Sequence, residues 1–309
     1  MAEFKVPPDV FAAVMATGIV SIAADDQGYR WISVGLAGLA VAALPVLVVV
    51  CAVAWRRAPL DWRDPDVTVR LFTYVAACAV LGARFVETRW AAWILAALAY
   101  QAWVTLTPVV LRAMWKYRWT GLRDRAHGAW ELAAVATSGL AIVSADVRWL
   151  FGALLFWALA IAVYGVMTGL ILWRTAHDRL DRDGFEPDSW ILMGGLAIAT
   201  LAGDHIHRLW PSAAVESITI VTWVLATLWI PPLVYFGIRR VNRGPGTLVF
   251  RGVWWAMVFP LGMYSSATFA MARETGVAAF GTVSLVFFWV AFAAWVVVAF
   301  SGFRRVFAR

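Results

Sequence analysis

The chain has 309 residues, of which 62% are hydrophobic and 15% are charged, and its mean hydropathy is +0.75. This composition excludes an ordinary soluble domain, because about 20 consecutive, mostly apolar residues are enough to cross a bilayer. The formal net charge of +7 does not indicate nucleic-acid binding, since the basic residues are spread between apolar stretches and no recognition motif accompanies them.

Ten apolar stretches fill the chain and predict ten membrane-spanning helices, because a backbone in lipid must satisfy its own hydrogen bonds. In chain order they lie at residues 8–24, 31–55, 69–86, 90–115, 129–145, 148–173, 189–206, 214–238, 252–272 and 277–301. Taken in pairs they form five helical hairpins, at residues 8–55, 69–115, 129–173, 189–238 and 252–301. The predicted fold class is therefore an all-α integral membrane protein, with residues 1–309 as a single transmembrane domain.

Basic residues concentrate in every second gap between these stretches and at both chain ends. The residues concerned are Lys5, Arg56, Arg57, Arg63, Lys116, Arg118, Arg123, Arg125, Arg174, Arg179, Arg182, Arg239, Arg240, Arg243, Arg251, Arg304, Arg305 and Arg309. Because cytoplasmic loops of membrane proteins carry an excess of Lys and Arg, these gaps are predicted to face the cytoplasm. Both termini are then cytoplasmic, which agrees with an even number of spans.

The odd-numbered stretches are shorter than the even-numbered ones, and each carries a glycine toward its outer part. The glycines recur roughly every 60 residues, about the length of one hairpin, at Gly18, Gly82, Gly139, Gly203 and Gly262. We interpret this spacing as five copies of a hairpin with the short members around one central axis. Glycine also lets membrane helices pack closely, so helix packing stays open as an alternative.

Small and hydroxylated residues of the odd-numbered stretches are the candidate lining of this axis. They are Thr17, Gly18, Gly82, Thr137, Ser138, Gly139, Thr200, Gly203, Gly262 and Ser266. A weakly polar wall suits a pore, because conduction requires that an ion bind weakly. Packing between helices uses the same residue types and remains an equal alternative. Ionisable residues within the odd stretches lie toward their ends, which argues against a proton-relay pump.

The ninth stretch contains a proline in its interior, Pro260, directly after Phe259. Proline removes a backbone hydrogen bond and crowds the preceding turn, so a bend or break is predicted there. Such a bend would aim the ring of Phe259, which makes this residue a candidate plug for a narrow hydrophobic pore. Ordinary packing of an aromatic side chain is the alternative.

Three segments carry a resemblance to a known family: Trp254–Leu261 (WWAMVFPL), Val14–Gly18 (VMATG) and Ala79–Phe85 (AVLGARF). Together with weaker likenesses in the fifth, seventh and eighth stretches, they cover essentially the whole chain. The sequence resembles the tellurite-resistance/dicarboxylate transporter family, and its prokaryotic members most closely. That family includes the plant slow anion channels, the bacterial tellurite-resistance channel homologue, the fungal malate permease and the fungal sulfite pump.

The resemblance implies ten helices as five hairpins in a quasi-five-fold arrangement around a central pore lined by the odd-numbered helices. It also implies a homotrimer and a gate formed by Phe259 with Pro260. The implied function is an anion channel or transporter that passes small inorganic anions or C4-dicarboxylates across the cytoplasmic (inner) membrane. Channel and carrier mechanisms both remain open at this point.

Some ionisable residues near helix ends have two interpretations each. Arg84 either attracts anions to a pore mouth or extends to the lipid headgroups. Asp204, His205 and His207 either sense pH or bind a metal, or they are solvated interfacial side chains. Glu131 either takes part in transport or, as we predict, caps the start of the fifth helix, where the helix dipole favours a negative charge.

The alternative function is a membrane-embedded redox or metal-binding protein. This function would need histidine pairs within the spans, whereas His127 and His177 are predicted in loops. The two cysteines, Cys51 and Cys78, lie in apolar stretches and are predicted to be buried thiols. Because no phosphate-binding loop, nucleophile elbow or zinc-ligand motif is present, we expect neither an enzyme nor a bound cofactor or metal. The expected partners are a small anion, the lipid bilayer and further copies of the chain.

Overall fold

The computed structural model describes residues 6–177, 186–242 and 252–307, and within them every regular element is helical and no strand is present. The longer helices of this described part are α1 (Ala12–Asp26), α2 (Arg30–Arg57), α4 (Phe72–Arg84), α5 (Arg89–Lys116), α7 (Leu132–Asp146), α8 (Leu150–Ala176), α9 (Ile191–Leu209), α10 (Ala213–Val241), α11 (Trp255–Thr275) and α12 (Ala278–Phe307). The short helices are α3 (Pro65–Arg70), α6 (Arg118–Arg123), η1 (Gly128–Glu131), η2 (Pro187–Trp190) and η4 (Gly252–Trp254).

Several predicted boundaries differ from the observed ones, chiefly where a short helix leads into a longer one. The predicted span at residues 69–86 is divided at Leu71, because Asp64 accepts a hydrogen bond from Asp66 N and, with Pro65 in the first turn, starts the separate helix α3. The first span begins at Ala12, later than predicted, and continues to Asp26.

Eight helical segments of the described chain are long and apolar enough to cross a membrane. Helices α1 and α11 are not among them. Helix α1 has only 15 residues, and α11 carries the hydroxyl groups of Ser265, Ser266 and Thr268 in its middle. Both helices are tolerated because most of their side chains are buried against other helices and do not face lipid.

The shorter helices α1, α4, α7, α9 and α11 form the interior, and we call them the inner helices. In an apolar stretch of 18 residues within Gly128–Asp146, which contains α7, 94% of the residues are buried, whereas the value for the corresponding stretch of α2 is 28%. The longer helices, which we call the outer helices, expose many apolar side chains. Trp31 and Trp115, near outer-helix ends, are 90% and 87% exposed, as expected for an aromatic belt at the membrane interface.

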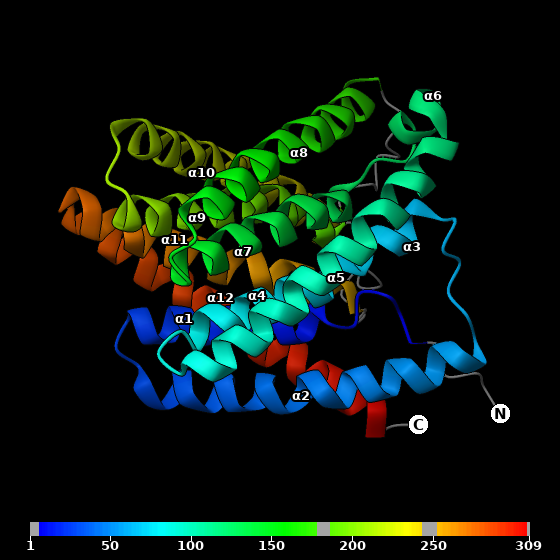
Figure 1. Cartoon of the computed structure of the whole chain (residues 1–309), viewed down its shortest axis with the longest axis horizontal. Helices are drawn as coiled ribbons and strands as arrows, with labels where there is room; N and C mark the ends of the chain where they lie inside the picture. Colours follow the sequence, from blue (N-terminus) through cyan, green and yellow to red (C-terminus); the bar gives the residue numbers. More distant parts are fainter. Residues whose placement is uncertain (1–5, 178–185, 243–251, 308–309) are drawn as a thin grey trace.

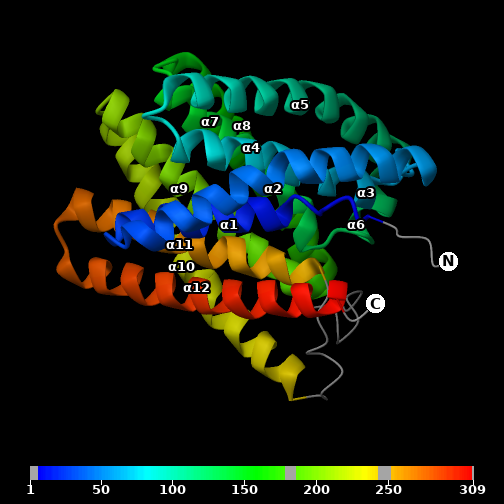
Figure 2. The ribbon, with the colours of Figure 1, turned by 90° about the horizontal axis from the view of Figure 1, so that it is seen from below.

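The inner helices contact one another in a closed order: α1 with α4, α4 with α7, α7 with α9, α9 with α11, and α11 with α1. Each inner helix also packs against the outer helix that follows it in the chain, as α11 and α12 do in Figure 2. Each outer helix in turn contacts the next inner helix, so that α12 contacts α1. Every inner helix in the described chain is therefore held by outer helices on two sides.

The connections between each inner helix and its outer partner are short and lie at one end of the bundle, which we call the short-turn end (Figure 1). The start of α1 and the end of α12 lie at the opposite end, the termini end, together with α3 and α6. Two of the short turns are built alike. Tyr29 N donates to Ala24 O and Trp149 N donates to Ser144 O, both at 2.8 Å. This similarity supports an internal repeat.

Candidate functional site

Phe259 and Pro260 lie in the first half of α11, on the inner-helix ring. The side chain of Phe259 is fully buried and does not face lipid. Of the predicted bend or break, a break does not occur: α11 continues through Pro260 as one helix, although proline has no N–H to donate to the carbonyl of Ala256. The neighbouring helix α9 accommodates the proline ring, since a Cβ added to Gly194 would lie only 2.9 Å from Pro260 Cγ. The position of Phe259 is thus set by a close contact between two inner helices.

The three threonines of the predicted lining make hydrogen bonds to outer helices. Trp295 Nε1 of α12 donates to Thr17 Oγ1, and Trp103 Nε1 of α5 donates to Thr137 Oγ1, both at 2.9 Å. The hydroxyl of Thr200 lies 2.9 Å from that of Thr222 in α10. These hydroxyl groups therefore join inner and outer helices.

The indole bonds follow a pattern around the ring. Trp157 Nε1 of α8 donates to the carbonyl of Ala199 in α9 at 2.8 Å. Trp223 Nε1 of α10 donates to Thr268 Oγ1 in α11 at 3.1 Å. In each case the tryptophan belongs to the outer helix of the preceding hairpin, as it does for α1 and α7. The described chain thus shows four of these inter-hairpin bonds, which we call indole clasps.

Loss of one indole clasp should destabilise the protein measurably. Trp295→Phe removes the N–H that reaches Thr17 while keeping most of the ring's apolar area. We expect a loss of about 1 kcal/mol, in the range of hydrogen bonds between membrane helices. The midpoint of thermal unfolding in detergent measures this loss. Trp31→Phe is the control, because Trp31 is 90% exposed; an equal loss in both variants would contradict the assignment.

The five predicted repeat glycines lie where helices approach closely. A Cβ at Gly18 would lie 2.9 Å from Val80 Cγ1, and a Cβ at Gly139 would lie 2.9 Å from Ala79 Cβ. These two contacts join α1 and α7 to α4 inside the ring. The other three sites are also contact positions: Gly262 faces Ile19, Gly82 faces Val143 and Leu95, and Gly203 faces Thr219 and Trp157. Glycine at four of these positions therefore sets the distance between helices, whereas a Cβ at Gly82 would make only ordinary van der Waals contact.

The two serines of the predicted lining differ from the threonines. Ser138 in α7 and Ser266 in α11 are both buried, yet neither hydroxyl has a hydrogen-bond partner within the described chain. A buried hydroxyl without a partner costs free energy. The preceding residues in the chain differ, because the hydroxyl groups of Thr137 and Ser265 both form hydrogen bonds to outer helices. Ser138 and Ser266 thus retain unused hydrogen-bonding capacity in the interior.

Arg84 lies at the short-turn end of α4 and is held by several groups. It donates from Nε to Ser21 Oγ at 3.1 Å and from Nη2 to Ser33 Oγ at 2.8 Å. Its guanidinium also lies 3.5 Å from Asp25 Oδ1. These bonds connect α4 to α1 and α2, so the charge of Arg84 is partly compensated where it stands.

The acidic and histidine side chains at the end of α9 pair with neighbouring helices. His205 Nδ1 lies 2.8 Å from Asp146 Oδ1 of α7, and His207 Nε2 lies 3.5 Å from Glu274 Oε1 of α11. Asp204 is buried at the same end. Within the residues that the structure describes, no three His, Cys, Asp or Glu side chains are placed to hold one metal ion.

Asp26 ends α1 among these charged groups. Its Oδ2 atom is shielded from solvent and has no hydrogen-bond partner in the described part of the chain. Ser266 of α11 lies beside this carboxylate, although no hydrogen bond of standard geometry joins the two described side chains. The positive charges of His205 and Arg208 favour the ionised form of Asp26. Arg208 forms an ion pair with Asp204. A carboxylate therefore stands beside one of the two unpaired serines.

Sequence reasoning missed a polar network at the termini end. Arg70 pairs with Asp9 at 2.9 Å, and Trp130 Nε1 donates to Asp66 Oδ1 at 2.6 Å. These bonds join α3 to the segment before α1 and to η1. A signal was present, because an acidic residue stands at or just before the start of four odd-numbered stretches, at Asp9, Asp66, Glu131 and Asp188.

Glu131 lies next to Trp130 in the chain but does not cap its helix as predicted. It occupies the N-cap position of α7 without a side-chain capping bond. Its carboxylate turns to the outer helix α8, where Thr168 Oγ1 donates to Oε1 at 2.6 Å. Its Oε2 atom is buried and has no hydrogen-bond partner among the described residues. Burial and the bond to Thr168 thus replace the expected cap.

Comparison with known proteins identifies the family of the chain. The sequence model of a family described as voltage-dependent anion channel matches residues 5–302. Two uncharacterized membrane proteins of Mycobacterium tuberculosis, from strains H37Rv and CDC 1551, are each 33% identical over 144 residues, which are 44% of this chain and 72% of the relative. The predicted multi-pass membrane location is thereby confirmed. Since the family match covers nearly the whole chain, this protein belongs to the voltage-dependent anion channel family.

Proposed function

We propose that the protein conducts small inorganic anions or C4-dicarboxylates along the axis of the inner-helix ring, with Phe259 as the gate. The family supports anion transport as the general function. The observation that carries the finer proposal is the closed order of contacts among α1, α4, α7, α9 and α11, with Phe259 fully buried on one of these helices. A ring of this kind in a quasi-five-fold arrangement has one central axis, where a benzyl side chain can close a narrow path.

We assign different roles within the proposed lining. Ser138 and Ser266 are the proposed hydrogen-bond donors to a passing anion, because their hydroxyl groups are buried and unpaired within the described chain. The threonines and glycines contribute by fixing the helices that form the wall, since their hydroxyl groups and Cα atoms are used in helix contacts. Weak, uncharged donors of this kind allow an anion to bind and leave.

The orientation and assembly follow from the same proposal. The termini end carries most of the basic residues of the described chain, among them Arg56, Arg57 and Arg239, and we place it in the cytoplasm by the positive-inside rule. Residues 1–309 then act as one transmembrane domain. The resemblance to trimeric relatives supports a homotrimer in which each chain has its own path.

An anion panel in proteoliposomes tests the function. Purified protein is reconstituted, and uptake of chloride, nitrate, sulfite, malate and tellurite is measured against empty liposomes and against the same protein after heat denaturation. We expect flux for at least one of these anions. If the folded protein moves none of them above the level of empty liposomes, the proposed function is wrong.

The unpaired serines give a more specific expectation. The double variant Ser138→Ala and Ser266→Ala removes two donors, each worth about 1 kcal/mol to a bound anion, so anion flux should fall about thirtyfold. Stability should not fall, because neither hydroxyl makes a hydrogen bond of standard geometry with another described residue. Ser217→Ala is the control, since that hydroxyl is exposed on α10 and bonds to Ala213 O of its own helix. Unchanged flux in the double variant would exclude these serines from the path.

A further inference from the structure

His127, the residue before η1, lies at the termini end, where the segments that lead into four inner helices meet. Its Nδ1 atom lies 4.0 Å from Asp66 Oδ1 of α3, and its Nε2 atom lies 3.9 Å from Asp188 Oδ2 of η2. The Nη2 atom of Arg70, at the end of α3, lies 3.4 Å from the same Nε2 atom. Arg70 also pairs through Nη1 with Asp9, which precedes α1. The segments that lead into α1, α4, α7 and α9 are therefore connected around one imidazole ring.

The Nε2 atom of His127 cannot serve both of its neighbours at once. In a neutral imidazole this atom can accept a hydrogen bond from Arg70 Nη2, whereas in a protonated imidazole it carries a hydrogen and only donates. The acceptor for that hydrogen is Asp188 Oδ2, which is buried and has no hydrogen-bond partner in the described chain. Arg70 can be released without loss of its other contact, because Asp9 holds a different nitrogen of the guanidinium. A proton on His127 thus exchanges one partner for another.

Acidic and basic side chains stand on the elements around His127. They are Asp66 and Arg70 of α3, Glu131 of η1, Arg174 of α8, Asp188 of η2 and Glu186 directly before η2. Glu131 is directed to a threonine of α8, and Arg174 donates to a backbone carbonyl. Asp66 and Asp188 therefore provide one acceptor for each N–H of protonated His127. Because an N–H···O bond is about 2.7–3.2 Å long, a shift of about 1 Å closes each contact.

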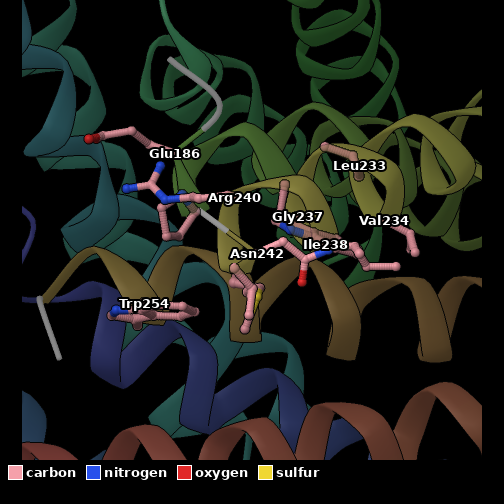
Figure 3. Close-up of a pocket in the computed structure, with 12 residues that line it drawn as sticks. Glu186, Leu233, Val234, Gly237, Ile238, Arg240, Asn242 and Trp254 are labelled. Carbon is pink, nitrogen blue, oxygen red and sulfur yellow. The ribbon is translucent and has the colours of Figure 1, made fainter. Parts of the chain in front are cut away.

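Asp188 stands on a short element that leads directly into the inner helix α9. In the first turn of α9, Gly194 packs against the ring of Pro260, beside the proposed gate. Residues of η2 also line a pocket of about 370 Å³ with the end of α10 and the start of α11, where Figure 3 labels Glu186 and Trp254. The pocket leaves η2 room for a small shift, which a close-packed interior would resist.

We propose that His127 is a proton-binding site that regulates anion flux from the termini end. Histidine is the side chain whose charge ordinarily changes between about pH 5 and 8. Protonated His127 releases Arg70, pairs with Asp188 and draws η2 and the start of α9 toward η1. Because α9 holds Pro260, this movement narrows the ring at the gate and lowers flux at acidic pH. The effect on flux rests on the proposed function, whereas the exchange of partners does not.

Double-mutant cycles on thermal unfolding in detergent test the exchange of partners without any transport. His127→Gln is combined with Asp188→Asn in one cycle and with Arg70→Gln in the other, at about pH 5.5 and about pH 7.5. The cycle with Asp188 should show a coupling of at least about 2 °C at the lower pH only, and the cycle with Arg70 at the higher pH only. The structural cost of each single substitution cancels in a cycle. Couplings that do not change with pH would overturn the proposal.

The effect on flux is measured with nitrate or chloride, which keep their charge in this pH range, at equal pH on both sides of the proteoliposome membrane. Flux through the unmodified protein should fall about fivefold between the higher and the lower pH, and His127→Gln should abolish this fall. His177→Gln is the matched control, because its imidazole is exposed at the same end and stacks on Trp173 of α8.

Flux that rises on acidification, or an unchanged pH profile in His127→Gln, would contradict regulation by this site. If no anion of the panel moves, the proposed function fails, and the cycles still decide the exchange of partners by themselves.

Discussion

Replacing Phe259 with alanine should raise anion flux about tenfold or more. If the benzyl group closes the proposed path, its removal opens a channel through the inner-helix ring and lowers the barrier by more than about 1.4 kcal/mol. The measurement is the rate of chloride or nitrate uptake into proteoliposomes, normalised to the amount of folded protein. The effect should be larger for the smaller anion, because a widened constriction still excludes bulky ones.

The same substitution separates a gate from ordinary packing. If Phe259 only fills space, its truncation to alanine lowers the free energy of unfolding of the protein by about 3–5 kcal/mol. Anion flux then stays at its basal level. Phe269→Ala provides the comparison on the same helix, since Phe269 is only partly buried. A stability loss without increased flux, or equal flux increases in both variants, would show that Phe259 is not the gate.

Neutralising Asp26 should also raise anion flux, by about tenfold. Its carboxylate stands beside Ser266, which we propose as an anion donor, and its Oδ2 atom lacks a hydrogen-bond partner in the described chain. Two like charges about 4 Å apart repel by about 1 kcal/mol in water and about 4 kcal/mol near a protein surface. Asp26→Asn removes this repulsion while keeping the shape of the side chain.

The uptake assay and the anions are those used for Phe259→Ala. Glu87→Gln serves as the control, because Glu87 is an exposed carboxylate at the same short-turn end. If general surface charge were responsible, both variants would increase flux alike. Raised ionic strength would then abolish the increase of each variant over the unmodified protein. A local effect confined to Asp26 persists in salt. Lower flux in Asp26→Asn would show that the carboxylate assists transport, against our expectation.

The class of protein and its membrane location could be predicted from the sequence, because the length and hydropathy of the spans are properties of the chain itself. The starts of the inner helices could not. Whether residues 65–71 continue a span or form a separate helix depends on the cap at Asp64 and the position of Pro65, which are decided locally. The same limit applies to η1, whose Trp130 donates a hydrogen bond to Asp66, 64 positions away.

The candidate site shows a second limit. Thr137 and Ser138 are neighbours of similar composition, yet one bonds to Trp103 of an outer helix and the other has no partner in the described chain. Successive residues point in directions about 100° apart around the helix axis. Composition does not determine which of the two residues faces the outer helix. The abundance of tryptophan was a usable signal, because a buried indole N–H needs an acceptor.

The indole clasp between Trp295 and Thr17 joins residues that are 278 positions apart. During synthesis, α1 is made before α12, the helix that supplies its clasp. Thr17 Oγ1 therefore cannot accept the hydrogen bond from Trp295 until α12 has been made. Until then it can keep its hydrogen bond to Ala13 O of its own helix. Closure of the circle is thus a late step in biogenesis, and a ribosome stalled before α12 leaves an open arc whose first and last edges are exposed to chaperones and proteases.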